Sequence, residues 1–168
     1  MVRSEGFHLL GGFDEDFFAH MEEIDLCWKL KRLRKRVFYC GESTVYHVGG
    51  GTLSEGSPAK TYYNFRNGLA MLIKHQPVGQ LAWKLPTRIL LDWIAAVRFL
   101  TSTPSCFLAV PKAHFYVLFH LGVILAKRNA LRKDQNFSFK VTEMWPNVLV
   151  WHYFVKGEKT FKALSSPK

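Results

Sequence analysis

The chain has 168 residues and a formal net charge of +10, because 23 lysines and arginines outnumber 13 aspartates and glutamates. That length suits one domain, or one domain with an appendage, and a content of 48% hydrophobic and 15% aromatic residues excludes a disordered chain. The three cysteines are odd in number and lack zinc-ligand spacing, which favours a reduced, cytosolic setting over a disulfide framework. The excess positive charge is either a solvated basic surface or the footprint of an anionic partner: nucleotide phosphates, an acidic membrane or nucleic acid.

The first part of the chain predicts two helical segments. Residues 1–12 form a short helix or a loop that ends at Gly11 and Gly12. From about Phe17 to Arg34 the apolar residues recur at helical spacing, which predicts a helix. Its acids gather in the first part and its bases in the last part, as the helix macrodipole favours.

Two short strands and a glycine-rich loop are expected next. VFYC (37–40) and TVYHV (44–48) are rich in β-branched and aromatic residues, which is typical of strands. GGGTLSEGSP (49–58) has no periodicity and predicts a loop of the kind that often acts as a lid. A helix is expected from about Ala59 to His75.

The chain becomes strongly apolar after Pro77. ILLDWIAAVRFL (89–100) and FYVLFHLGVILA (115–126) are apolar runs, and the second is followed at once by the basic run KRNALRK. Twelve residues are few for a bilayer span, which needs about 20, so a core helix and an interfacial or re-entrant helix are both favoured over a span. The bases favour the interface, because anionic headgroups attract them. We expect two regions, residues 1–75 and a helical, membrane-associated region of residues 76–168.

Six carboxylates lie between residues 11 and 30 of this basic chain. Glu22 and Asp25 are three residues apart and share a helix face, while Glu23 lies about 100° round the helix. Adjacent carboxylates of this kind can supply a general base, although the same acids can simply stabilise a helix start. His47 ends an expected strand and can ligate a metal through its neutral imidazole, but a lone histidine is more often a surface or core residue.

The run GGFDEDFFAHMEEIDLCWKLKRLRKRVFYCGESTVYHVGGGT (11–52) resembles the C-terminal half of the catalytic domain of inverting family-2 glycosyltransferases. It is most similar to the bacterial rhamnosyltransferase-like group that builds cell-surface polysaccharides. The shared pattern is G-G-F-D-E-x-F-F, an acidic pair, I/V-D-L-C-W, a basic helix, a strand, and V-x-H before glycines. SPAKTYYNFRN (57–67) fits the later S-P-x-K-x-Y-x-x-x-R-N stretch. The resemblance covers residues 1–75 strongly and the remainder loosely.

The resemblance implies the GT-A fold, an α/β class in which a Rossmann-like sheet binds a nucleotide sugar and a divalent metal. This chain would supply its C-terminal half, followed by a mostly helical, amphipathic region. The family's catalytic base falls on Glu23, where the family usually has Asp, and Glu22 is the competitor. The resemblance also assigns substrate-binding positions to Gly11, Gly12, Asp25 and Arg66, and a metal-ligand position to His47. Of these, Asp25 is expected to orient the helix rather than to act as the base.

The implied reaction transfers a sugar from a nucleotide-sugar donor to a saccharide or polyprenyl-linked acceptor with inversion. The family's D-x-D metal motif and its nucleotide-binding strand lie upstream of the matched segment. We therefore expect an incomplete Mg²⁺ or Mn²⁺ site and no turnover by this chain alone, with an N-terminal half or an oligomer completing the enzyme. The expected location is cytoplasmic and peripheral, on the inner face of the cell membrane.

Two other functions are compatible with parts of the sequence. One is a non-catalytic membrane-surface module of a polysaccharide assembly complex, which the apolar and basic second region favours. The other is a nucleic-acid binder, which charge and aromatic content alone suggest. The chain has no aromatic–basic motif of a known nucleic-acid-binding fold, and its acids would repel phosphate. We therefore expect no nucleic-acid partner.

Overall fold

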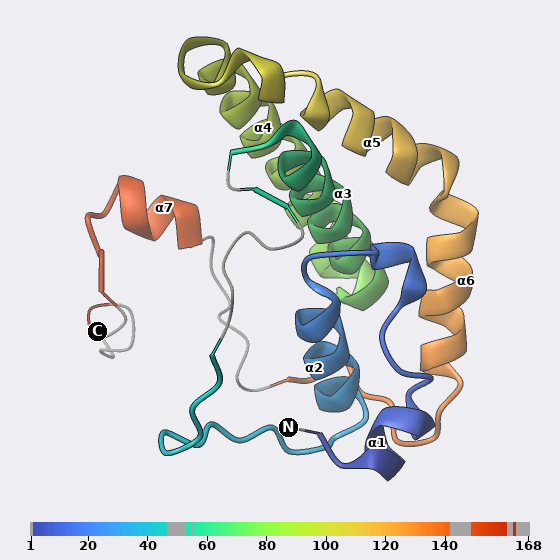
Figure 1. The fold of residues 1–168 in the computed structure, drawn as a ribbon. Coiled ribbons are helices and arrows are strands. Elements are labelled where there is room, and N and C mark those ends of the chain that lie inside the picture. Colours follow the sequence, from blue (N-terminus) through green and yellow to red (C-terminus); the bar gives the residue numbers. More distant parts are fainter. Residues whose placement is uncertain (1, 47–52, 55, 142–148, 161–162, 164–168) are drawn as a thin grey trace.

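The computed structural model describes residues 2–46, 53–54, 56–141, 149–160 and 163, and all the regular secondary structure in these ranges is helical (Figure 1). The elements are α1 (Ser4–Leu9), η1 (Glu15–Phe17), α2 (Glu22–Arg32), α3 (Pro58–His75), α4 (Val78–Ser102), η2 (Pro104–Cys106), α5 (Ala109–Phe119), α6 (Leu121–Arg132) and α7 (Leu149–Phe154). No strand occurs within the described ranges. The expected α/β class with a Rossmann-like sheet is therefore wrong.

Helix α3 is the element around which the others pack. It contacts α5 most extensively and also α6, α4 and α2 (Figure 1). Ser57 caps its start by accepting from the Lys60 amide at 3.2 Å, and Pro58 occupies its first turn, where a missing N–H costs nothing. Its second half is buried almost all round. The helix expected at residues 59–75 is confirmed, and it packs against helices from both sides of residue 75.

The core lies between α3 and the helices that surround it. Its buried members are Phe17, Leu69, Ala70, Met71, Ile73, Val117 and Ile124. They come from η1, α3, α5 and α6, so the apolar contacts that hold the fold join its first and second regions. The boundary expected near residue 75 stays a prediction, although packing crosses it.

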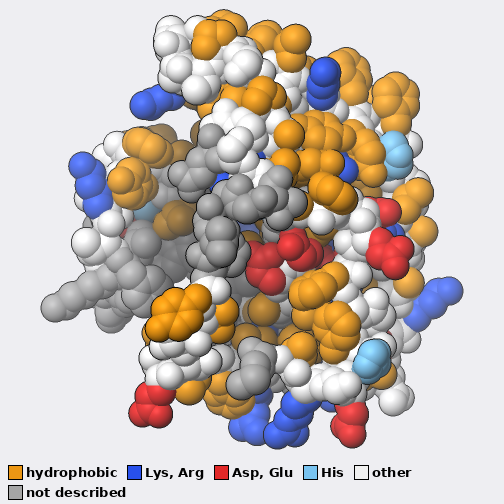
Figure 2. Space-filling model, viewed as in Figure 1, with side chains coloured by type: hydrophobic (Ala, Val, Ile, Leu, Met, Phe, Trp, Pro, Cys, Tyr) orange, Lys and Arg blue, Asp and Glu red, His pale blue; other side chains and the backbone are white. Residues whose placement is uncertain are grey.

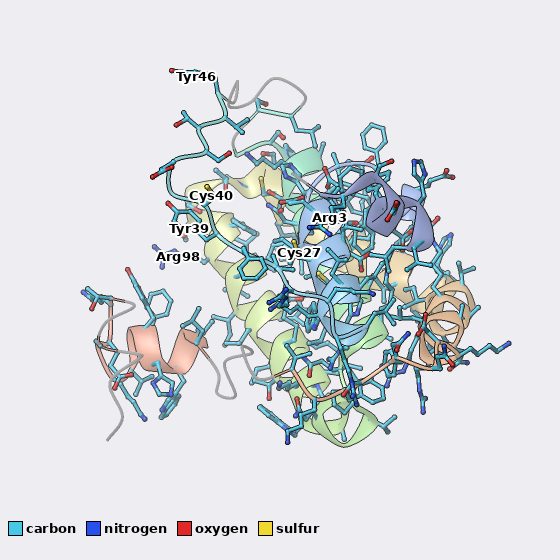
Figure 3. All side chains as sticks on the ribbon, turned by 90° about the horizontal axis from the view of Figure 1, so that it is seen from below. Arg3, Cys27, Tyr39, Cys40, Tyr46 and Arg98 are labelled. Atoms are coloured by element: carbon cyan, nitrogen blue, oxygen red, sulfur yellow. The ribbon has the colours of Figure 1, made fainter. Side chains whose placement is uncertain are left out.

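The expected strands at 37–40 and 44–48 do not form in the described part of these segments. Residues 37–46 have no regular structure and are exposed, and Tyr39 and Tyr46 point away from the helices (Figure 3). A strand needs a neighbour to satisfy its backbone N–H and C=O groups. No segment is placed beside this one to do so within the described ranges, so β propensity alone does not decide the structure.

The apolar run at 115–126 is divided between two helices. Helix α5 ends at Phe119 and α6 begins at Leu121, and the pair is bent by 62°. No single described helix is long and apolar enough to cross a membrane, whereas Pro104–Phe119 and Leu121–Arg132 pass the length and composition test together. Val117 and Ile124 of this run are core residues, so part of the run faces inward.

Candidate functional site

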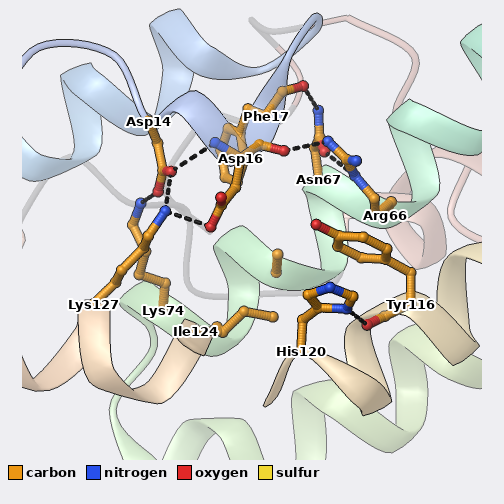
Figure 4. Close-up of a pocket in the computed structure, with 11 residues that line it drawn as sticks. Asp14, Asp16, Phe17, Arg66, Asn67, Lys74, Tyr116, His120, Ile124 and Lys127 are labelled. Carbon is orange, nitrogen blue, oxygen red and sulfur yellow. Dashed lines mark hydrogen bonds and ion pairs between the residues drawn. The ribbon is translucent and has the colours of Figure 1, made fainter. Parts of the chain in front are cut away.

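A buried network of ion pairs joins the loop before η1 to α2, α3 and α6. Lys74 Nζ lies 2.7 Å from a carboxylate oxygen of Asp14 and 2.7 Å from one of Asp25, and all three side chains are at most 4% exposed. Lys127 of α6 contacts Asp14 and also Asp16, which is at the surface (Figure 4). Because two acids share each lysine, charge is nearly balanced inside the network. Breaking one such buried pair leaves an uncompensated charge, at a cost of about 3–5 kcal/mol.

Asp25 and His75 set each other's protonation state at the centre of this network. Burial alone would raise the pKa of Asp25, but the His75 hydrogen bond and the Lys74 charge outweigh it and hold that pKa well below its usual range. Burial lowers the pKa of His75 to about 4, so this ring is neutral near pH 7. His75 Nε2 lies 2.7 Å from Asp25 Oδ1 and therefore carries the proton it donates. The ring also stacks on Trp28, with centroids 4.8 Å apart.

Residues 16–21, which we call the strap, lead into α2 and are fastened by two side chains of α3. Asn67 Nδ2 donates to the carbonyls of Phe17 (3.0 Å), Ala19 (2.8 Å) and His20 (2.8 Å). Arg66 donates to the Asp16 carbonyl, and its Nε donates to Asn67 Oδ1 at 2.8 Å (Figure 4). The helix expected from Phe17 therefore begins only at Glu22, because these bonds hold the strap in another conformation.

The strap is strained along its backbone. Phe18, His20 and Met21 have φ of 52°, 69° and 70°, in the left-handed region that residues other than glycine rarely adopt. Each such residue costs on the order of 1–3 kcal/mol, and strain of this kind persists only where the surroundings enforce it. The Asn67 bonds supply that enforcement.

Arg66 is buried rather than open to a phosphate. Its guanidinium lies 5.5, 4.7 and 4.8 Å from the ring centroids of Tyr62, Tyr63 and Tyr116. Its side chain is 7% exposed, and its hydrogen bonds go to the strap and to Asn67. In this arrangement Arg66 supports the strap.

The acidic pair follows the strap, in the first turn of α2. Glu23 is exposed and Glu22 is half-buried. Glu22 Oε2 is fully enclosed and has no hydrogen-bond partner within the described residues. In contrast, all three aspartates of residues 11–30 contact a lysine. Figure 2 shows acidic side chains gathered in the middle of the face of the molecule that it presents.

Two hollows adjoin the network. A cavity of about 20 Å³, with room for about one water, is lined by Arg66, Tyr116 and Lys127 among others. A wider, open hollow of about 550 Å³ is lined by Gly11 and by charged residues of the network. Gly12 is buried, with φ of 73°, and an added Cβ would lie 3.2 Å from the Phe7 ring. Gly12 therefore serves a tight turn.

The described residues do not provide a metal site. Nowhere in them do three His, Cys, Asp or Glu side chains gather to hold a metal ion. Asp14 and Asp16, which line both hollows, are engaged by lysines instead. His47, the expected ligand, lies outside the described residues. The described residues by themselves therefore do not assemble a divalent-cation site, because the aspartates nearest the hollows are paired with lysines.

Sequence reasoning brought out Asp25 and Arg66 but missed their partners. Asn67, Lys74 and His75 look like ordinary helical residues, and Lys127 is 113 positions away from Asp14. The available signal was the R-N pair of the SPAKTYYNFRN stretch, because Arg66 and Asn67 both act on the strap.

The chain was also compared with known proteins. No family model, no curated protein and no solved structure matches it.

The neutral, buried His75 predicts a loss of stability in mild acid. Its pKa is about 4 in the folded chain and ordinarily 6.5, so the unfolded chain binds the extra proton between these values and stability falls as pH falls. We expect the free energy of unfolding to drop by about 2 kcal/mol between about pH 7 and pH 5 from this group. Urea unfolding across this range measures it. H75Q should flatten the slope and the exposed-site control H8Q should keep it; equal slopes in both variants would contradict the assignment.

We expect the substitution N67D to destabilise the strap more than the rest of the fold. The substitution keeps the shape but removes the donor of three hydrogen bonds, which we expect to cost on the order of 1–3 kcal/mol. Hydrogen exchange should accelerate most at the amides of residues 16–25. N129D, at an exposed position of α6, is the matched control. Uniform acceleration along the chain would show that Asn67 supports the whole fold and not the strap in particular.

Proposed function

We propose that this chain carries the acceptor-activating part of an inverting, nucleotide-sugar-dependent glycosyltransferase of cell-surface polysaccharide synthesis. The ordered motifs of residues 11–67 support the reaction class. One observation of the structure supports the site: within the described residues Glu22 and Glu23 have no cation partner, whereas Asp14, Asp16 and Asp25 each have one, and one oxygen of Glu22 is enclosed without a donor.

The enclosed oxygen of Glu22 favours a ligand rich in hydroxyl groups. A buried acceptor without a donor costs about 1–3 kcal/mol. In the proposal, the side chain of Glu22 shifts so that a sugar hydroxyl donates to this oxygen. A ligand that supplies such a donor recovers the cost, and saccharides present several in a small volume.

The exposed carboxylate of Glu23 is the proposed general base. In the proposed reaction it takes the proton of an acceptor hydroxyl as that oxygen attacks the anomeric carbon of the donor. The bond from the anomeric carbon to the nucleoside diphosphate breaks on the opposite face, which inverts the configuration. Asp25, tied to Lys74 and His75, anchors the helix turn that presents the pair.

The metal, the donor and the second region's location stay predictions. Mg²⁺ or Mn²⁺ would stabilise the leaving diphosphate when bound, and His47 is the residue of this chain that the resemblance assigns to it. The donor and the saccharide or polyprenyl-linked acceptor are proposed from the resemblance. The same holds for a cytoplasmic, peripheral location and for completion by an N-terminal half or an oligomer.

The acidic pair predicts how two isosteric variants behave. We expect methyl glycosides to bind the chain weakly, and E22Q to weaken that binding about tenfold by removing a charged acceptor. Where transfer is measurable, E23Q should lower kcat by about 10²–10⁴-fold with little change in KM. Ligand-observed NMR with a panel of methyl glycosides, and transfer assays with nucleotide sugars, measure the two effects.

The matched control is E42Q, which makes the same change at an exposed glutamate away from α2. It should behave as the unmodified chain in both assays. If no glycoside binds, and E22Q and E23Q match E42Q, then the pair serves only the helix start and the proposal is wrong.

A further inference from the structure

Helix α4 carries an apolar stripe that the rest of the described chain leaves uncovered. The stripe's large members, all exposed, are Trp83, Ile89, Leu90, Trp93, Ile94, Val97 and Leu100. At 100° per residue they fall within an arc of about 140°, and no charged residue of α4 lies in that arc. The 25 residues of α4 make it about 37 Å long. The stripe, from Trp83 to Leu100, therefore runs along about 26 Å of the helix.

Helix α5 extends this surface. Leu108, Phe115, Leu118 and Phe119 are between 59% and 80% exposed, and they lie opposite the residues that α5 buries against α3. The two helices meet where the Trp93 ring stands edge-on to His114, with centroids 6.1 Å apart. Figure 2 shows apolar side chains along the edge of the molecule over α5.

The charge around this surface has one sign. Residues 78–133 contain eight lysines and arginines and a single acid, Asp92. Asp92 is buried, and its carboxylate is held by Arg88 Nε at 2.6 Å and His114 Nε2 at 3.0 Å. Arg98 and Lys112 are exposed. The surface thus combines uncovered apolar groups with cations and no exposed carboxylate.

We infer that the α4–α5 surface docks on an anionic lipid bilayer, with the stripe in the interface and the flanking cations at the headgroups. Interfacial helices combine a Trp-, Phe- and Leu-rich face with basic flanks, and each base near an anionic surface contributes about 1 kcal/mol. Tryptophan suits this position because its ring is apolar and its N–H is polar. A second copy of the chain fits less well, because it would bring the same positive charge against the surface.

This surface coincides only in part with the run that the sequence favoured, since it takes Phe115, Leu118 and Phe119 from that run and adds the stripe on α4. The run at 115–126 turns Val117 and Ile124 into the core, whereas the stripe on α4 is continuous. The inference does not rest on the proposed transferase, since neither Glu22 nor Glu23 belongs to the surface.

Flotation of the full chain with vesicles tests the inference. We expect binding to phosphatidylglycerol–phosphatidylcholine vesicles, at least about tenfold weaker binding to phosphatidylcholine alone, and weakening by salt. The double variant V97Q/F119Q should bind at least about tenfold more weakly. The double variant V45Q/F38Q makes the same two changes at residues that are 82% and 75% exposed but lie outside the surface, and it should bind normally.

Tryptophan fluorescence separates insertion from electrostatic adhesion. Lipids brominated on their acyl chains should quench Trp83 and Trp93, and W83F/W93F should lose that quenching. Equal binding of the two double variants, equal binding to neutral and anionic vesicles, or absence of quenching would each overturn the inference. Concentration-dependent dimers that V97Q/F119Q abolishes, without vesicle binding, would assign the surface to a second copy instead.

Discussion

The ion pair between Lys74 and Asp25 is the interaction on which the arrangement of this chain depends. It joins α2 to α3 inside the protein, where neither side chain is more than 4% exposed. Lys74 also holds Asp14, and Lys127 brings α6 to the same carboxylate. With no sheet in the described ranges to fix the order of the segments, these charges do so. A buried pair is costly to form but far more costly to break, so it selects one arrangement over alternatives that apolar packing alone would tolerate.

The strap shows how that arrangement can serve a site. Three left-handed residues would relax if they were free, and Asn67 prevents this by donating to the carbonyls of Phe17, Ala19 and His20. Because the strap is held out of helical geometry, α2 begins at Glu22. Glu22 and Glu23 therefore lie in its first turn and not in the middle of a longer helix. At a helix start, the free N–H groups of the first turn favour negative charge. The negative charge of this pair therefore suits the helix start, although the described residues place no lysine beside it.

The sequence predicted the helices better than the contacts between them. The segment 59–75 has a cap, a proline in the first turn and helical periodicity, so local signals determine it. Residues 37–46 have equally clear β propensity, but strands need partners that are far away in the sequence, and none is placed beside them within the described ranges. The helix start at Glu22 was missed for the same reason: Asn67 decides it from 45 positions away. The resemblance pointed to the acidic pair, whereas Lys74, His75 and Lys127 become recognisable only in three dimensions.

Acids and bases are separated along this chain. Nine of the 13 acids lie within the first 55 residues, and between residues 78 and 133 the only acid is buried. A chain that bound anions only through its overall positive charge would not need its acids and bases to be separated. Here Glu22 and Glu23, for which the described residues provide no cation partner, lie side by side at the start of α2, and the exposed Arg98 and Lys112 flank an uncovered apolar stripe. Separation of this kind suits a protein that meets hydroxyl-rich ligands on one side and anionic headgroups on the other. In such a protein, opposite charges in one place would weaken both interactions.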